Sequence, residues 1–291
     1  MPPREKNTKK VAAARYFHGP GDIEDKLAVK ESGYADLVTE LRAGAVPPGK
    51  EPLVAEFVSH LIVRTKHLRD GLESFGRVGM PAFLDALCDP ANAAKVRELV
   101  RKEAEETLKH LPPAERRSLE PGLDRFVDEQ LARFRVERQV RGDPPVSAQD
   151  SQLKALDGPV TAIARTGVLE QLTWSVVQAA GGDLILGDIG AVARGEGEPL
   201  LESPLQFNSG VPSAIYLPIS SERLLVGQRV PGPLDPIDDI NVSSAELSRD
   251  FFVARCNGAR EQAYHSSVGR RAEFMEPEEI RRLAADVFRA E

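Results

Sequence analysis

The chain has 291 residues, of which 41% are hydrophobic and 29% are charged, and its formal net charge is −7 at pH 7. This length suits one large domain or two small ones, and the composition is that of an ordinary globular protein. The acidic balance excludes an overall electrostatic attraction to nucleic acid or anionic membranes, so any basic surface must be local.

The cysteines and the first residues bear on the compartment in which the protein works. Cys88 and Cys256 are far apart and lack CxxC spacing, which predicts neither a zinc site nor a disulfide framework and favours a reduced, cytoplasmic setting. The opening stretch, MPPREKNTKK, is basic and polar with no apolar run behind it, so we expect no secretory signal. No window approaches the ~20 apolar residues of a membrane-spanning helix.

The N-terminal region predicts disorder over residues 1–10, a short strand over 11–16, and then a helix. Asp22 is a good N-cap for that helix, which we expect to reach about Arg42, and Gly44 suits its C′ position. Glu31 lies at the edge of the apolar face of this helix.

A second amphipathic helix is predicted from about Pro52 to Glu73. Arg64 sits on the border of its apolar stripe. His60 and His67 lie beyond Arg64, farther from the core, and we expect both at the surface. Their spacing is longer than the i, i+4 spacing of helical metal-binding pairs.

Residues 80–141 are expected to form helices broken at prolines, with alternating acidic and basic residues on solvated faces. A further helix is expected to start at Ser147 or Asp150 and to end near Leu169. Within this helical region, residues 97–141 are long and charged enough to offer a surface to a protein partner.

The second half of the chain predicts strands, in the runs LTWSVVQAA, DLILGDIG, SAIYLPIS, ERLLVGQRV and FFVARC. INVSSAELSRD predicts a short helix, with Asn241 as its cap or in the turn before it. Pro277 and the acidic residues after it are typical of a helix start. The chain therefore predicts an α+β fold, with a helical part over about 22–169, a β-rich part over about 170–256 and a terminal helix over about 277–290. We expect residues 11–291 to form a single domain.

Motifs that identify common enzyme classes are missing from the sequence. No dinucleotide-binding glycine motif, phosphate loop, HExxH, GxSxG or EF-hand loop is present. The glycines of QAAGGDLILGDIG flank a strand and predict turns. Ser209 has no histidine spaced to suggest a catalytic triad.

The order of these landmarks resembles a known bacterial family. LAVKESGYADLVTELRAG, FVSHLIVRTKHLRDGL, LTWSVVQA, LILGDIGAV, IYLPISSERLLV and INVSSAELSRDFFVAR follow one another over roughly residues 11–256. This succession is similar to that of domain of unknown function 4238. In that family, a tryptophan strand precedes a strand ending in a Ser-Asp-Asn-Pro-like turn, and an asparagine precedes a later short helix. The family has no established activity.

Two features depart from the family pattern. The Ser-Asp-Asn-Pro turn reads Gly187-Asp188-Ile189-Gly190, which keeps only the aspartate. Family members usually open with a His-Tyr-x-Pro segment that has no counterpart here. Without this segment, a catalytic activity inherited from the family is not expected. A misplaced start codon or a truncated chain would also lack the segment.

The resemblance implies four site residues: Glu31, Arg64, Asp188 and Asn241. His60 is a further candidate for substrate binding. The carboxylates, the arginine and the histidine could bind a divalent metal or an anionic substrate, or perform acid–base chemistry. A framework role is the alternative, with Glu31 and Arg64 forming an ion pair between helices and Asp188 accepting backbone N–H bonds in its turn.

Two functions remain open from the sequence. One is a hydrolase directed at a phosphate or a nucleic acid, with Asp188 and Glu31 around a divalent metal and with Arg64 and His60 toward the phosphate. The other is a non-catalytic partner-binding or regulatory protein that uses residues 97–141.

Overall fold

The α+β class predicted from the sequence is confirmed. Helices dominate the N-terminal half, an antiparallel sheet follows, and a helix lies near the C-terminus. The computed structural model describes residues 23–109, 120–142, 147, 148, 150, 151, 166–180, 183–205, 212–272 and 277–286. The segments expected over 1–10 and 11–16 lie outside the described residues, as does most of the helix expected to end near Leu169.

The chain divides into two compact units, Met1–Leu72 with Ala148–Phe274, and Glu73–Ser147 with Met275–Glu291. In the described part of the first unit lie the strands, α2 (Ile23–Ala43), α3 (Glu51–Val63), α11 (Ile237–Leu247), α12 (Ala259–His265) and the larger part of α4 (Lys66–Ser74). The second holds a π-helical stretch (Phe75–Gly79), α5 (Met80–Cys88), α6 (Ala93–Lys109), α8 (Leu123–Arg141) and α13 (Pro277–Asp286). The single domain expected over 11–291 stays a prediction.

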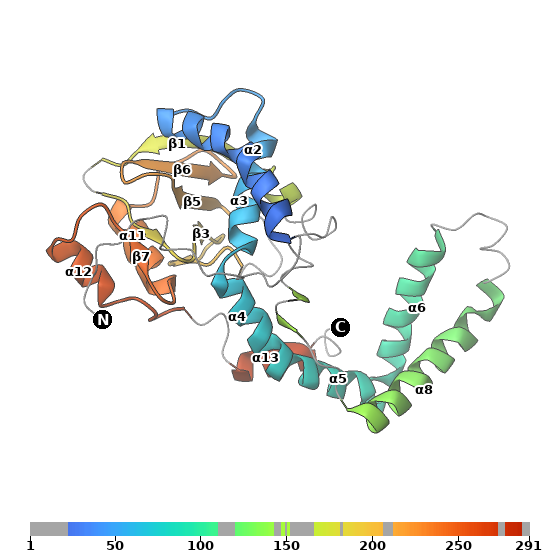
Figure 1. The fold of residues 1–291 in the computed structure, drawn as a ribbon. Coiled ribbons are helices and arrows are strands. Elements are labelled where there is room, and N and C mark those ends of the chain that lie inside the picture. The colour runs from blue at the N-terminus through green and yellow to red at the C-terminus, as the bar shows by residue number, and fades with distance from the viewer. Residues whose placement is uncertain are drawn as a thin grey trace. The chain divides into compact units, whose positions relative to one another are not determined.

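A five-stranded antiparallel sheet forms the centre of the first unit (Figure 1), in the order β1-β6-β5-β3-β4. Its strands are β1 (Thr173–Gln178), β3 (Val192–Arg194), β4 (Leu201–Glu202), β5 (Ala214–Pro218) and β6 (Arg223–Gln228). A second, two-stranded sheet pairs β2 (Leu186–Gly187) with β7 (Phe252–Val253). Every residue of β5 is buried, as the continuous apolar run AIYLP predicts for a central strand covered on both faces.

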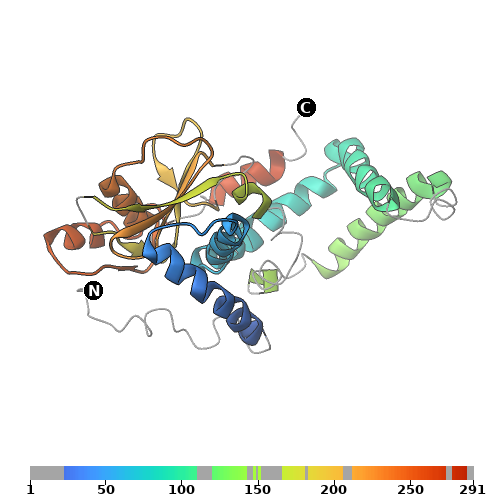
Figure 2. The ribbon, with the colours of Figure 1, turned by 90° about the horizontal axis from the view of Figure 1, so that it is seen from above.

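Helices cover both faces of the large sheet, because alternate strand residues point to opposite sides. Ile215, Leu217 and Leu225 pack in one core cluster with residues of α2 and α3. Tyr216, Leu224 and Val226 pack in another with residues of α11. Figure 2 shows the strands between these two helical layers. The sheet therefore lies between α2 and α3 on one face and α11 on the other.

Trp174 on β1 lies opposite Gly227 on β6. A Cβ on Gly227 would come within 2.7 Å of the indole ring, so only glycine fits at that position. The indole is buried, and its Nε1–H donates to the Leu169 carbonyl at 3.2 Å. This close contact explains why the edge strand carries the one tryptophan and why its neighbour lacks a side chain.

The single helix predicted from Pro52 to Glu73 is wrong, because α3 ends at Val63 and α4 begins at Lys66. Thr65 causes the break. Its hydroxyl accepts from the backbone N–H of Leu68 at 3.3 Å, as an N-cap does, and donates to the Ile62 carbonyl at 2.9 Å. Thr65 thus closes one helix and starts the next.

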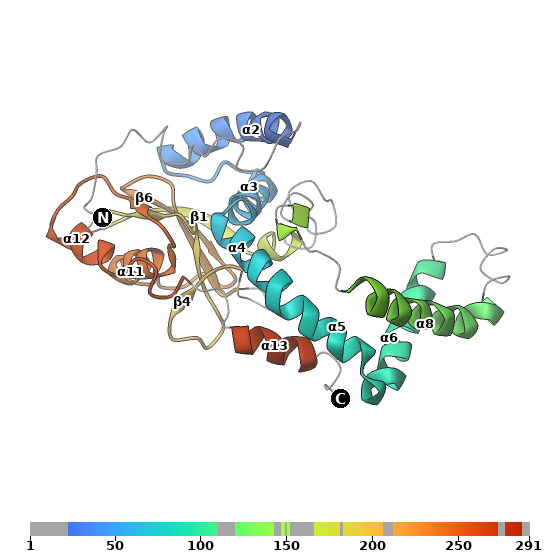
Figure 3. The same ribbon diagram turned by 60° about the horizontal axis from the view of Figure 1, so that its bottom comes forward.

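In the second unit, α6 and α8 run side by side (Figure 3). Val96 and Val127 are fully buried. Ion pairs Arg97–Asp128 and Arg101–Asp124 join the two helices at 3.0 and 3.3 Å. The alternating charges predicted for this region therefore serve two purposes, since some of them join helices and the others remain in solvent.

Candidate functional site

The Asp188 carboxylate lies in the turn directly after β2 and holds the loop after α11. It accepts hydrogen bonds from three successive backbone N–H groups, those of Arg249 at 2.9 Å, Asp250 at 2.7 Å and Phe251 at 3.3 Å. The backbone N–H of Asp188 also donates to the Phe251 carbonyl at 3.1 Å. Both carboxylate oxygens are therefore engaged with the backbone.

Gly187 lets this turn approach α11 closely. A Cβ at that position would lie 2.2 Å from the Ser248 hydroxyl and 2.6 Å from the Ser244 carbonyl. Ser248 itself donates its hydroxyl to the Ser244 carbonyl at 2.6 Å. Glycine is thus required at position 187 by the neighbouring helix end.

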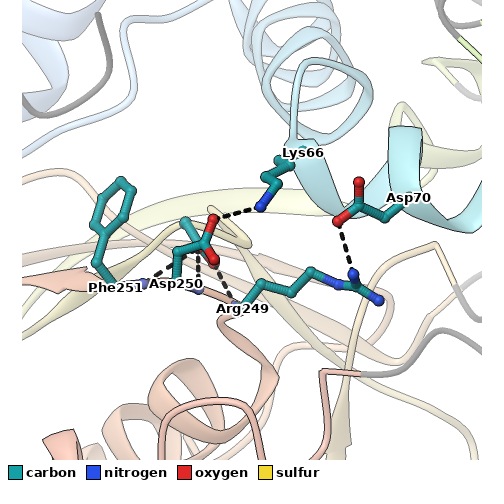
Figure 4. A network of polar contacts seen from close by, with 6 residues as sticks. Lys66, Asp70, Arg249, Asp250 and Phe251 are labelled. Carbon is teal, nitrogen blue, oxygen red and sulfur yellow. Dashed lines mark hydrogen bonds and ion pairs between the residues drawn. The ribbon is translucent and has the colours of Figure 1, made fainter. Parts of the chain in front are cut away.

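Two ion pairs join the loop held by Asp188 to α4 (Figure 4). Lys66 reaches Asp250 at 2.6 Å, and Arg249 reaches Asp70 at 2.7 Å. The first pair is about half exposed, whereas the Asp70 side chain is only 17% exposed. We call these four residues together with Asp188 and His67 the Asp188 network. It connects the α4 helix, the turn after β2 and the loop after α11.

His67 is the buried histidine of this network, with 3% of its surface exposed. Burial, together with the nearby positive charge of Arg249, lowers the pKa of His67 to about 4, although the negative charge of Asp70 opposes the change. The imidazole is therefore neutral at physiological pH. The expectation that His60 and His67 lie at the surface is wrong, because each packs into the fold.

The pKa of Asp188 shifts in the opposite sense. Burial raises the pKa of Asp188, and the three backbone N–H bonds, which favour the charged carboxylate, offset only part of that rise. The hydrogen bond to Asp250 raises the pKa of Lys66 and keeps its ammonium charged. Near Arg249, the pKa of Asp188 is therefore raised and the pKa of His67 is lowered.

Comparison with known families identifies the family of this chain. The model of the family described as "Protein of unknown function (DUF4238)" matches residues 1–276. The chain belongs to this family. No curated protein and no solved structure matches it. The region of the match includes Asp188 and the backbone groups that its carboxylate accepts from.

Among the other residues that the resemblance implied, Arg64 comes closest to the network in sequence. It forms the C-cap position of α3, two residues before Lys66, and is half-buried. Glu31 lies on α2, and its side chain is outside the part of the chain that the structure describes. Whether these two residues pair stays a prediction.

Asn241 has a framework contact of its own. It lies inside α11 rather than at its start, so the expectation of a cap or turn residue is wrong. Its fully buried amide accepts from the backbone N–H of Ile185 at 3.1 Å and donates to the Asp183 carbonyl at 3.0 Å. These two bonds fix the strand that leads into the Asp188 turn.

His60 lies on α3 against the Tyr34 ring, with 5.7 Å between ring centroids. The Tyr34 hydroxyl donates to Glu56 at 2.9 Å. Its 8% exposure places His60 in the core between α2 and α3. A role in substrate binding for this histidine stays a prediction.

Sequence reasoning missed Lys66, Asp70, Arg249 and Asp250. Each stands in an ordinary charged stretch, and the partners in each pair are more than 170 residues apart in sequence. In the described part of the chain, no group of three or more His, Cys, Asp or Glu side chains is placed to hold a metal ion. None of the described helices is long and apolar enough to cross a membrane.

Proposed function

We propose that the protein is a non-catalytic binding protein that presents one side of α8 to a helical partner. The observation that carries the proposal is a row of exposed apolar side chains. Phe126, Val136 and Val140 are 52%, 58% and 78% exposed. Val136 and Val140 lie on the side of α8 away from the buried Val127, and Phe126 lies at the edge of that side. Charged residues stand between and beside them, as they do along helices that pair with other helices.

We define the α8 stripe as the six residues that make up this side before Val140: Arg125, Phe126, Glu129, Arg133, Val136 and Glu137. Val140 continues it by one turn. The stripe lies within residues 97–141, the region for which the sequence predicts a partner surface. Spacings of three and four residues along it are those of a seam between two helices.

The chemistry of the Asp188 network also supports a binding function. The acidic group that a hydrolase would use at the family turn already accepts three backbone bonds, and the Asn241 amide is engaged on both sides. A side chain with all its oxygens bound to backbone is poorly placed to bind a metal or take a proton. The polar family positions Asp188 and Asn241 thus fit a framework role.

Photo-crosslinking tests the proposal. A benzophenone amino acid replaces Val136 in the full chain, and in a control it replaces Lys102, an exposed residue of α6. We expect covalent adducts in cells from position 136 and none from position 102. Equal adduct formation at both positions, or none at either, would contradict the proposal.

A metal-dependent hydrolase directed at phosphate or nucleic acid is the second candidate. It is favoured by the opposite pKa shifts of Asp188 and His67, because such pairs gather at acid–base sites. The buried Nε of Arg249, which has no acceptor among the described residues, would suit a phosphate oxygen. In this candidate, Asp188 and Glu31 would hold the metal, and Arg64 and His60 would lie toward the phosphate.

A hydrolase screen with Mg²⁺ or Mn²⁺ distinguishes this candidate. Hydrolysis of phosphomonoesters or phosphodiesters should fall in both Asp188→Ala and His67→Gln if the network is catalytic. His265→Gln, at an exposed position of α12, is the control. Activity that is unchanged in Asp188→Ala, or that is missing from the wild-type protein, would exclude the hydrolase.

A further inference from the structure

The α8 stripe carries a symmetry in its sequence. Three pairs of its residues stand at equal distances in sequence from Leu131: Arg125 with Glu137, Phe126 with Val136, and Glu129 with Arg133. Each pair joins two apolar side chains or two opposite charges. Reading the stripe backwards thus places every residue against a partner that complements it.

We propose that the α8 stripe binds the same stripe of a second copy of this chain, antiparallel, around a two-fold axis at Leu131. This inference rests on the proposed binding function and names its partner. In a two-fold contact the residue pairs repeat, so that Phe126 packs on Val136 of the second copy on both sides of the axis. Glu129 then meets Arg133 of the second copy, and Arg125 meets Glu137, again on both sides.

The charges of the stripe favour this partner over others. Two arginines and two glutamates cancel, which gives no attraction to nucleic acid or to a strongly charged peptide. Within one chain, Arg125 pairs with Glu129 at 2.7 Å and Arg133 with Glu137 at 2.9 Å. The arginines of these pairs are 86% and 71% exposed, so they are free to extend into networks with a second copy.

Orientation follows from the same residues. A parallel pair would set Glu129 against Glu129 and Arg133 against Arg133, which repels at both positions. The antiparallel pair removes both repulsions and aligns the apolar residues. Val127, Asp124 and Asp128 face α6, so the stripe lies on the side of α8 that points away from α6.

The contact is small, and this limits its strength. The stripe spans about three turns, or ~20 Å of helix. A pair of helices of this length buries less than the ~1,200 Å² of a standard stable interface. We therefore expect a weak dimer that forms with increasing protein concentration and dissociates on dilution.

Charge reversal with mixing tests the dimer in the full chain. Glu129→Arg sets two arginines together twice, and Arg133→Glu sets two glutamates together twice, so each variant alone should bind itself at least about tenfold more weakly. Mixed in equal amounts, the two variants regain opposite charges at both places. The mixture should therefore dimerise more strongly than either variant. Lys102→Glu on α6 changes the net charge equally and should dimerise like the wild type.

Sedimentation velocity over a wide concentration range gives the answer, with circular dichroism to show that every variant stays folded. A wild-type monomer at all concentrations, or a mixture no more associated than its components, would overturn the proposal. Val136→Asp, also exposed, should abolish the dimer by burying a charge. If the wild type stays monomeric while position 136 crosslinks to another protein, the self-association fails and the proposed binding function stands.

Discussion

The backbone N–H of Asp250 donates a 2.7 Å hydrogen bond to the carboxylate of Asp188, which is 62 residues away in sequence. The N–H groups on either side of it donate to the same carboxylate. The Asp188 side chain thus accepts hydrogen bonds from three successive backbone N–H groups, which in a sheet would be paired by a neighbouring strand. Asp188 therefore has a structural role in holding the loop after α11.

Replacing Asp188 by asparagine should destabilise the fold. The amide keeps the shape, but its NH₂ group would face a backbone N–H, so at least one donor loses its acceptor. Leaving a buried donor unsatisfied costs about 1–3 kcal/mol. Chemical denaturation followed by the fluorescence of the single tryptophan measures the loss.

Asp250→Asn is the matched control for Asp188→Asn. Its side chain is 53% exposed and forms the ion pair with Lys66. Exposed pairs of this kind contribute about 0–1 kcal/mol. A loss in Asp188→Asn no greater than in Asp250→Asn would show that the three backbone bonds add little.

Asn241→Leu should be costly for a related reason. Leucine has a similar volume but removes the partner of the fully buried Ile185 N–H and of the partly buried Asp183 carbonyl. We expect a loss of about 2–4 kcal/mol in the free energy of unfolding. Asp239→Leu, at an exposed position of the same helix, should change it by less than about 0.5 kcal/mol. Equal effects would contradict the framework role.

Gly227→Ala tests the contact between the two strands. The added methyl group would lie 2.7 Å from the Trp174 ring, so the indole or the β6 backbone must move. Overpacking of this kind costs about 1–3 kcal/mol, and it should shift the tryptophan emission. Gly232→Ala meets no atom closer than 3.8 Å and should leave both stability and emission unchanged.

The sheet could be predicted from the sequence, because its long strands carry unmistakable apolar runs such as AIYLP. β3 and β4 are only three and two residues long, too short to leave a pattern. The break at Thr65 could have been predicted, since threonine is a common N-cap residue. The apolar stripe continues across Thr65, however, and this pattern favoured one continuous helix.

The Asp188 network could be predicted only in part. The resemblance made Asp188 a candidate residue, and its bonds to backbone N–H groups are those that aspartates in turns often accept. Its link to α4 depends on Asp70 and Arg249, which are 179 residues apart and join only because the sheet brings α4 and the loop after α11 together. No local pattern encodes such a pairing, and for the same reason the burial of His67 was not foreseen.

The neutral, buried His67 should make the fold sensitive to acid. Its pKa of about 4 in the fold lies below the ordinary 6.5, so between these values the unfolded chain binds a proton that the folded chain does not. Stability therefore rises with pH through this window and is lost as the pH falls. From pH 7.5 to pH 5, this one group should remove about 2 kcal/mol from the free energy of unfolding.

Denaturation of the wild type and of His67→Gln at both pH values isolates that contribution. Glutamine cannot take up the proton, so the variant should lose about 2 kcal/mol less than the wild type on going to pH 5. His265→Gln, which removes an exposed imidazole of α12, is the control for the substitution itself. If His67→Gln and the wild type lose the same stability, neither burial nor the charge of Arg249 lowers the pKa of His67 in the fold.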